Sequence, residues 1–351
     1  MVLISGKMRY WEGTARMGEE MPLLPEDVSW EAAQAQLEEL DLSDGLPLVP
    51  PTMARYESMV GGRGSPEEIF GYLMPLMGSL TLGTAAYNCV LAGCRPEELP
   101  VVLTAAEACM ADEFNLLGLL STTGTPTVAV CIHGPIVDIL GINACGNILG
   151  PGNRANACIG RAVSLIMRNV AGARPGVADM ATMGQPGKYT FCFGEGRHDA
   201  FPSLPERRGF IAADSCVTVL GVSGTMEVLP TGTSDSPECV LEPIAVAMNS
   251  NIDVTSLTRK PQRNEQVFLM PPEMADILAN HGWDLARVQA YLQGSRRAYG
   301  YMGETDLDER PLASVPDDIH PIITGGVGIK MTHTPLWAGG SRMVTRKVRE
   351  F

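Results

Sequence analysis

The 351-residue chain has few aromatic residues and no excess of basic charge. Phenylalanine, tryptophan and tyrosine make up 6% of it, so we expect binding sites lined by backbone groups rather than by aromatic stacking platforms. Its formal net charge of −14 argues against a nucleic-acid partner, because phosphate contacts need a basic surface. It has no uncharged apolar run of about 18 residues, so we also expect no membrane span.

The chain also lacks a recognisable signal peptide and a Cys-x-x-Cys pair. Its nine cysteines are an odd number, which fits free thiols in a reducing compartment. We therefore expect a cytoplasmic protein. Its 45% apolar and 19% charged residues are typical of a globular protein, and its length allows one large domain or two.

Helical and strand patterns alternate loosely, which predicts the α/β class with a helical N-terminal third followed by mixed strands and helices. We expect helices at 30–40, 65–77, 82–92, 96–110, 155–170, 239–248, 271–282 and 283–292. We expect strands at 127–132, 188–194, 216–222, 266–269, 321–324 and 342–348. The expected organisation is an irregular N-terminal arm (1–28), a main α/β domain (29–255) and a smaller α/β subdomain (256–351).

The most informative segment is 141–161, GINACGNILGPGNRANACIGR, which holds five glycines, four asparagines and two arginines. Glycine permits close backbone approach, and the helix start that follows offers free N–H groups and the positive end of the helix dipole. This segment predicts a site for a carboxylate or phosphate group. The predicted ligand residues here are Gly150, Gly152, Asn153, Arg154, Asn156 and Arg161. It is neither a Walker A loop nor a dinucleotide fingerprint, and the alternative is a long capped loop with Arg161 on a helix surface.

A second glycine-rich loop, GGVGIK at 325–330, follows the strand expected at 321–324. Its Gly326 and Lys330 are candidates to hold the same anion, and the alternative is a crossover between strands that needs glycine. Our working hypothesis is that the two loops share one pocket. A separation above about 20 Å would exclude that for one small ligand.

Six side chains are candidates for catalysis: Cys94, Cys145, His133, His333, Lys330 and Glu195. Cys94 lies before a helix start and beside Arg95, two features that lower the pKa of a thiol. Cys145 lies in the first glycine-rich loop, where backbone N–H groups are placed to stabilise an oxyanion. The histidines, Lys330 and Glu195 are candidates to move protons. For each of the six, a packing or surface role is the alternative.

Glu195 and His198, with Asp199 next to them, leave a metal site open as an alternative. The spacing does not form a closed ligand set of the kind that zinc sites show. The sequence therefore predicts no cofactor.

Three further stretches carry a family resemblance. They are DGLPLVPPT at 44–52, GPGNRANACIGRA at 150–162 with MGQPGKYTFCFGE at 183–195, and FLMPPEMADILANHGWDLARVQAYL at 268–292. Together they resemble bacterial proteins known as UGSC-motif (seleno)proteins or thiol oxidoreductases, over most of the chain. The resemblance implies a bacterial enzyme of small molecules. This chain departs from the family in having no Cys-Gly-Ser-Cys pair, which puts the redox activity in doubt.

Three functional hypotheses follow. The first is an enzyme of lyase, hydratase or hydrolase type that acts on a small anionic substrate by acid–base or cysteine chemistry. The second is a thiol-dependent oxidoreductase that needs a partner thiol. The third is a non-catalytic subunit of a larger assembly. We expect a homo-oligomer with a small anionic molecule as partner, and neither nucleic acid nor membrane.

Overall fold

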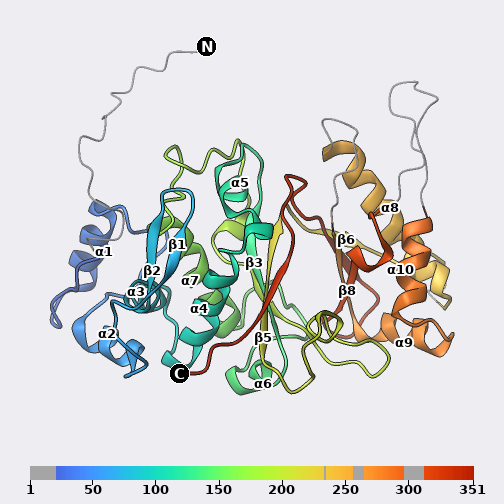
Figure 1. Cartoon of the computed structure of the whole chain (residues 1–351), viewed down its shortest axis with the longest axis horizontal. Coiled ribbons are helices and arrows are strands. Elements are labelled where there is room, and N and C mark those ends of the chain that lie inside the picture. The colour runs from blue at the N-terminus through green and yellow to red at the C-terminus, as the bar shows by residue number, and fades with distance from the viewer. Residues whose placement is uncertain (1–20, 233–234, 256–264, 296–311) are drawn as a thin grey trace, which may run out of the picture.

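Helices and sheets stack in four layers, in the order helix, sheet, sheet, helix (Figure 1). The computed structural model describes residues 21–232, 235–255, 265–295 and 312–351. The α/β class expected from the sequence is confirmed, and the N-terminal part is largely helical. No helix in these ranges is long and apolar enough to cross a lipid bilayer.

The first sheet has the strand order β10–β5–β3–β4. Its strands are β3 (Thr127–His133), β4 (Cys192–Gly194), β5 (Cys216–Val222) and β10 (Val344–Lys347). β3 and β4 are parallel, whereas β5 is antiparallel to both β3 and β10. α4 (Leu99–Ala108) packs against β5 and β10, and α7 (Arg154–Asn169) packs against β3 and β4. The outer face of this sheet is therefore covered by helices.

The second sheet has the order β6–β9–β7–β8. Its strands are β6 (Met226–Val228), β7 (Gln266–Met270), β8 (Ile319–Ile323) and β9 (Met331–Thr334). Again one pair, β7 and β8, is parallel. The helices on its outer face are α8 (Pro237–Thr255), α9 (Pro272–Asn280) and α10 (Leu285–Gly294), at the right of Figure 1.

The alternation of side chains along β3 explains how the sheets stack. Val128, Val130 and Ile132 pack in the core between the first sheet and the helices that cover it, α4 and α7. Ala129 and Cys131 point to the other face and pack in the core between the two sheets. Strands β5, β7 and β8 contribute to the same inter-sheet core through Leu220, Val222, Val267, Leu269 and Ile322. A strand that is apolar on both faces is expected where both faces are covered.

The remaining elements surround the first sheet. They are α1 (Trp30–Glu39), α2 (Met53–Val60), the β1–β2 hairpin (Ile69–Leu73 and Gly78–Thr81), α3 (Leu82–Ala92), α5 (Leu116–Ser121) and α6 (Ile136–Leu140). Short 3-10 helices are η1 (Pro96–Glu98), η2 (Asp112–Phe114), η3 (Pro186–Lys188), η4 (Glu206–Arg208) and η5 (Pro316–Asp318).

Two sequence-based element predictions are wrong. The helix expected at 65–77 is the β1–β2 hairpin, because a helix would place Gly71 and Pro75 in its interior. Gly71 has φ +154° and follows a register shift in the hairpin. The strand expected at 188–194 is reduced to 192–194, since η3 occupies the chain before it.

The layers do not follow the expected division after residue 255. β6 and α8 precede residue 255 but belong to the second sheet and its helices. β10 follows residue 255 but pairs with β5 in the first sheet. The chain therefore crosses between the two sheets more than once.

Of the expected N-terminal arm, residues 1–20 lie outside the described residues. In the described part, Leu24 forms a bridge with Thr52.

Candidate functional site

The carboxyl ends of the two parallel strand pairs meet at one edge of the molecule. Thr324, directly after β8, makes the junction: its N–H donates to the carbonyl oxygen of Met270 at the end of β7 (2.9 Å). Its hydroxyl donates to the carbonyl oxygens of Gly194 (2.7 Å) and Ala144 (3.1 Å). Segments that follow β3, β4, β7 and β8 are thus tied together. In α/β folds, the carboxyl edge is where ligands usually bind.

The two glycine-rich loops contact each other at this edge. The N–H of Gly325 donates to the carbonyl oxygen of Ala144 (3.0 Å). A Cβ atom added to Gly326 would lie 2.7 Å from the Cα of Gly146, so the approach requires glycine. The loops therefore lie far closer than the separation of about 20 Å that would exclude a shared pocket, and the shared pocket itself stays a prediction.

Several N–H groups in these loops are available to a ligand. Those of Gly146, Asn147, Gly326 and Val327 find no acceptor within the part of the chain that the structure describes. The N–H of Gly328 donates to the Glu273 carboxylate (2.6 Å), so this loop already holds one carboxylate group. The backbone here has the donors that a small anion needs.

Cys145 lies in the first loop, next to the contact between the loops. It is the exposed residue among the nine free cysteines, all of which fall within the described ranges. Its own N–H donates to the side-chain oxygen of Asn143 (2.9 Å), which fixes the turn around it. Of the thiols proposed for chemistry, Cys145 is the one that solvent reaches freely.

The asparagines and glycines of the first loop shape it. Asn153 caps α7 by accepting from the N–H of Asn156 (2.9 Å). The Asn156 amide, which is buried, bonds both backbone groups of Asn143 (2.8 and 3.0 Å). A Cβ on Gly150 would collide with the Asn147 side chain, whereas Gly152 is exposed with φ +113°. These residues hold the loop's conformation.

The two arginines expected to bind the anion are engaged elsewhere, which corrects that part of the prediction. Arg154 forms a bidentate ion pair with the buried carboxylate of Glu98. Arg161 forms another with Asp44 (2.9 and 2.8 Å) and also donates to the carbonyl oxygens of Leu46 and Pro47. A guanidinium fork satisfied by a carboxylate offers little charge to a ligand.

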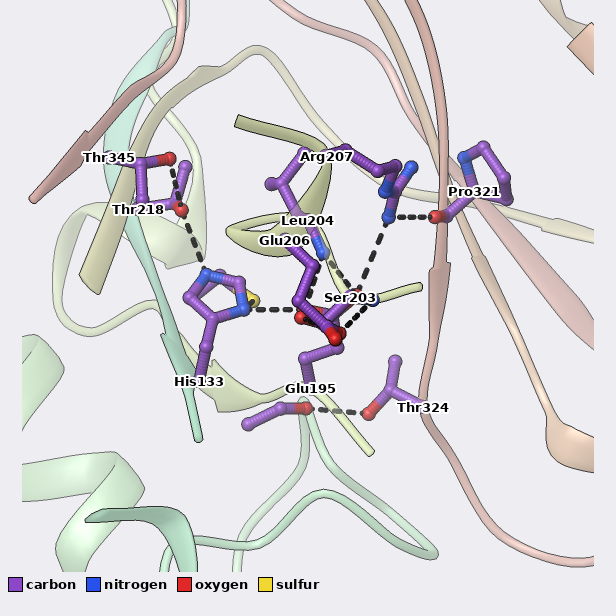
Figure 2. A network of polar contacts seen from close by, with 12 residues as sticks. His133, Glu195, Ser203, Leu204, Glu206, Arg207, Thr218, Pro321, Thr324 and Thr345 are labelled. Carbon is purple, nitrogen blue, oxygen red and sulfur yellow. Dashed lines mark hydrogen bonds and ion pairs between the residues drawn. The ribbon is translucent and has the colours of Figure 1, made fainter. Parts of the chain in front are cut away.

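His133 and Glu195, two of the proposed catalytic residues, lie in a buried network between the sheets (Figure 2). The Nδ1 atom of His133 is 2.6 Å from a carboxylate oxygen of Glu195. Glu195 also accepts from the N–H of Leu204 at 3.0 and 3.1 Å. Both side chains are almost fully buried, at 1% and 2% exposure. Glu195 follows Gly194, whose carbonyl oxygen accepts from Thr324, so the network joins the loop junction through the backbone.

Two sets of residues absent from the sequence prediction complete the network. The Nε2 atom of His133 is 2.8 Å from the Thr218 hydroxyl, which is 2.8 Å from that of Thr345. Arg207 lies 3.5 Å from Glu195 and donates to the carbonyl oxygen of Pro321 (2.7 Å), which links the two sheets. Burial lowers the pKa of Arg207, an effect that Glu195 opposes. Thr218 was detectable as a polar residue in an apolar strand; Arg207 gave no such signal.

The remaining three catalytic candidates take no part in the buried network around His133. Contact with the Cys89 thiol, followed by desolvation, raises the pKa of Cys94, which contradicts the prediction of a lowered one. His333 is buried on β9 opposite Phe268, and desolvation lowers its pKa to about 4. Lys330 is exposed and pairs with Glu227 at 3.3 Å.

The possible metal ligands point to different partners. Glu195 bonds His133, whereas His198 bonds Asp276 on α9 (3.1 Å). Within the described ranges, no group of three or more His, Cys, Asp or Glu residues has the geometry to hold a metal ion.

Comparison of the chain with protein-family models, curated proteins and solved structures found no match. The class of protein is therefore described by its fold and site alone. It is a four-layer α/β protein with a junction of two glycine-rich loops at the carboxyl edge of its parallel strands.

Proposed function

We propose that the protein is an enzyme that acts on a small carboxylate- or phosphate-bearing molecule at the junction of its two glycine-rich loops. The observation that carries the proposal is the backbone contact between these loops beside the exposed Cys145. Backbone N–H groups would hold the anionic group of the substrate, in the way that they stabilise oxyanions in other enzymes. The reaction class that fits is a lyase, hydratase or hydrolase.

Cys145 is the group we assign to the chemistry, as a nucleophile or a proton donor. We assign the buried His133–Glu195 pair the role of positioning the loop junction. Glu195 directly follows Gly194, and the carbonyl oxygen of Gly194 accepts the hydrogen bond from the Thr324 hydroxyl. Neither Arg154 nor Arg161 is assigned to the substrate, since each already pairs with a carboxylate.

The test is the thermal stability of the full chain with inorganic phosphate and with succinate, because a ligand that binds only the folded state raises the melting temperature. We expect saturable stabilisation, together with slower alkylation of Cys145 by iodoacetamide. Gly326→Ala should abolish both effects, since its Cβ would collide with Gly146. Gly224→Ala is the matched control, because a Cβ there meets no atom within 4 Å. Equal anion binding by the Gly326→Ala variant would refute the site.

The exposed thiol also favours a second candidate, a thiol-dependent oxidoreductase that works with a partner thiol. It predicts a mixed disulfide between Cys145 and a low-molecular-weight disulfide such as oxidised glutathione. The same alkylation experiment separates the two. Formation of that mixed disulfide, without stabilisation by either anion, would favour the oxidoreductase.

A further inference from the structure

Three thiols lie together at the end of α3. No sequence pattern indicated this cluster, because the chain contains no Cys-x-x-Cys pair. Cys89 lies in α3, Cys94 follows its last turn, and Cys158 lies in α7, which packs against α3. All three are free. None of them belongs to the glycine-loop junction, so the cluster needs an account of its own.

The way α3 ends brings the first two thiols together. Gly93 adopts a left-handed conformation (φ +80°), its N–H donates to Val90, and the N–H of Cys94 donates back to Cys89 (2.9 Å). This is the Schellman pattern, in which the side chain after the glycine packs on the one five positions earlier. This pattern places the Cys94 side chain against that of Cys89, and the contact raises the pKa of Cys94.

The third thiol comes from the neighbouring helix. A Cβ atom added to Gly93 would lie 3.7 Å from the sulfur of Cys158, so this sulfur lies against the residue that precedes Cys94. Arg154, one turn earlier in α7, lies near Cys158 while it pairs with Glu98. Burial raises the pKa of Cys158, and the neighbouring Arg154 opposes this effect only in part because it also pairs with Glu98.

The three thiols differ in access. Cys89 is buried and so is the thiol group of Cys94, whereas Cys158 is partly exposed. An oxidant therefore meets Cys158, with Arg154 beside it, before it meets Cys89. Cys94 packs on Cys89 and directly follows Gly93, which the Cys158 sulfur approaches, so Cys94 is placed to react with whichever neighbour is oxidised.

We propose that this cluster is a redox modification site in which Cys94 closes a disulfide, first with Cys158, when the protein meets a peroxide. Hydrogen peroxide oxidises the Cys158 thiol to a sulfenic acid, and one molecule of water leaves. The Cys94 sulfur then attacks the Cys158 sulfur: the S–S bond forms, the S–O bond breaks, and the hydroxyl group leaves as water with the thiol proton of Cys94. Two thiols thus supply the two electrons that reduce the peroxide. Cys89 can afterwards take the place of Cys158 by thiol–disulfide exchange, with no net oxidation.

The test uses the full chain treated with graded hydrogen peroxide, quenched with N-ethylmaleimide and digested without reduction for peptide mapping by mass spectrometry. We expect a cross-linked pair of peptides that contains Cys94 joined to Cys158, reversed by dithiothreitol. A Cys94–Cys89 product also supports the proposal, because it arises by exchange. The cross-link should form faster at higher pH, since burial and the neighbouring thiol hold the pKa of Cys94 well above its ordinary value.

Two variants keep the test decisive. Cys158→Ser, at a partly exposed position, should remove the first product, and Cys94→Ala should leave Cys158 as a sulfenic acid that dimedone traps. Cys239→Ser, at a partly exposed position on α8, is the matched control and should keep the cross-link. Oxidation of Cys158 to sulfinic or sulfonic acid in the wild type, with Cys94 still alkylated by N-ethylmaleimide, would overturn the proposal.

Discussion

Glu195→Gln is the most informative substitution in the buried network. It keeps the shape of the side chain and the acceptor for Leu204, but it leaves the Arg207 guanidinium without its counter-charge in a site where only 10% of that side chain is exposed. At 3.5 Å, with the effective dielectric constant of about 20 that suits protein sites, the lost attraction is about 5 kcal/mol. Removing one partner of a buried ion pair typically costs about 3–5 kcal/mol, so we expect a loss in this range.

The assay is urea unfolding, followed by far-ultraviolet circular dichroism and tryptophan fluorescence. Glu39→Gln, an exposed carboxylate on α1, is the control and should change the free energy of unfolding by less than about 1 kcal/mol. A double-mutant cycle with Arg207→Met isolates the pair: the double variant should be more stable than the sum of the single losses predicts, by about 1–3 kcal/mol. A Glu195→Gln loss no larger than that of the control would refute the role of this ion pair.

Two further predictions concern acid stability and the Asp44–Arg161 ion pair. His333 has a folded-state pKa of about 4 against an ordinary value of 6.5, so the unfolded chain binds the proton more tightly and stability falls as pH decreases through that window. The shift corresponds to about 3 kcal/mol, so His333→Leu should lose about 3 kcal/mol less stability than the wild type between pH 7 and pH 4, as measured by urea unfolding. Asp44→Asn should cost about 1–3 kcal/mol, because it removes the charge that holds Arg161, and should leave stabilisation by phosphate unchanged.

Each of these has a clear contrary result. An unchanged pH profile for His333→Leu would mean that the histidine is not held neutral by burial. Phosphate stabilisation that increases in Asp44→Asn would return Arg161 to the anion site, because its charge would then be free to act on the ligand. This second outcome would support the sequence-based prediction that Arg161 binds the anion.

Elements with strong local signals could be predicted from the sequence to within a residue. The strand Cys216–Val222 and the helix Leu82–Ala92 have the predicted bounds, because an apolar β-branched run and a terminal Gly93 define them without distant partners. The hairpin at 69–81 was missed because Ser65, Pro66 and two glutamates form a good helix start, although the chain beyond contains Gly71 and Pro75.

The site shows the same division between local and distant information. The glycine-rich loops were visible as patterns, but their contact depends on how the two sheets pack and on the hydrogen bonds from Thr324 and Gly325 to Ala144. The partners of the arginines were not visible: Glu98 precedes Arg154 by 56 positions, and Asp44 precedes Arg161 by 117. A cationic side chain in a sequence gives no indication of whether a distant carboxylate already neutralises it.

This pairing changes what an anion site in this protein would depend on. With a net charge of −14 and both nearby arginines neutralised, attraction of a substrate anion would come from fixed backbone N–H dipoles. Dipoles act over a short range, so their contribution depends on how closely the loops approach and only weakly on ionic strength. The Gly146–Gly326 contact sets that approach, and Thr324 sets it in turn through Gly194, the residue before Glu195. Loss of the buried ion pair would therefore reach the loops through two peptide groups, without any direct contact between Glu195 and the ligand.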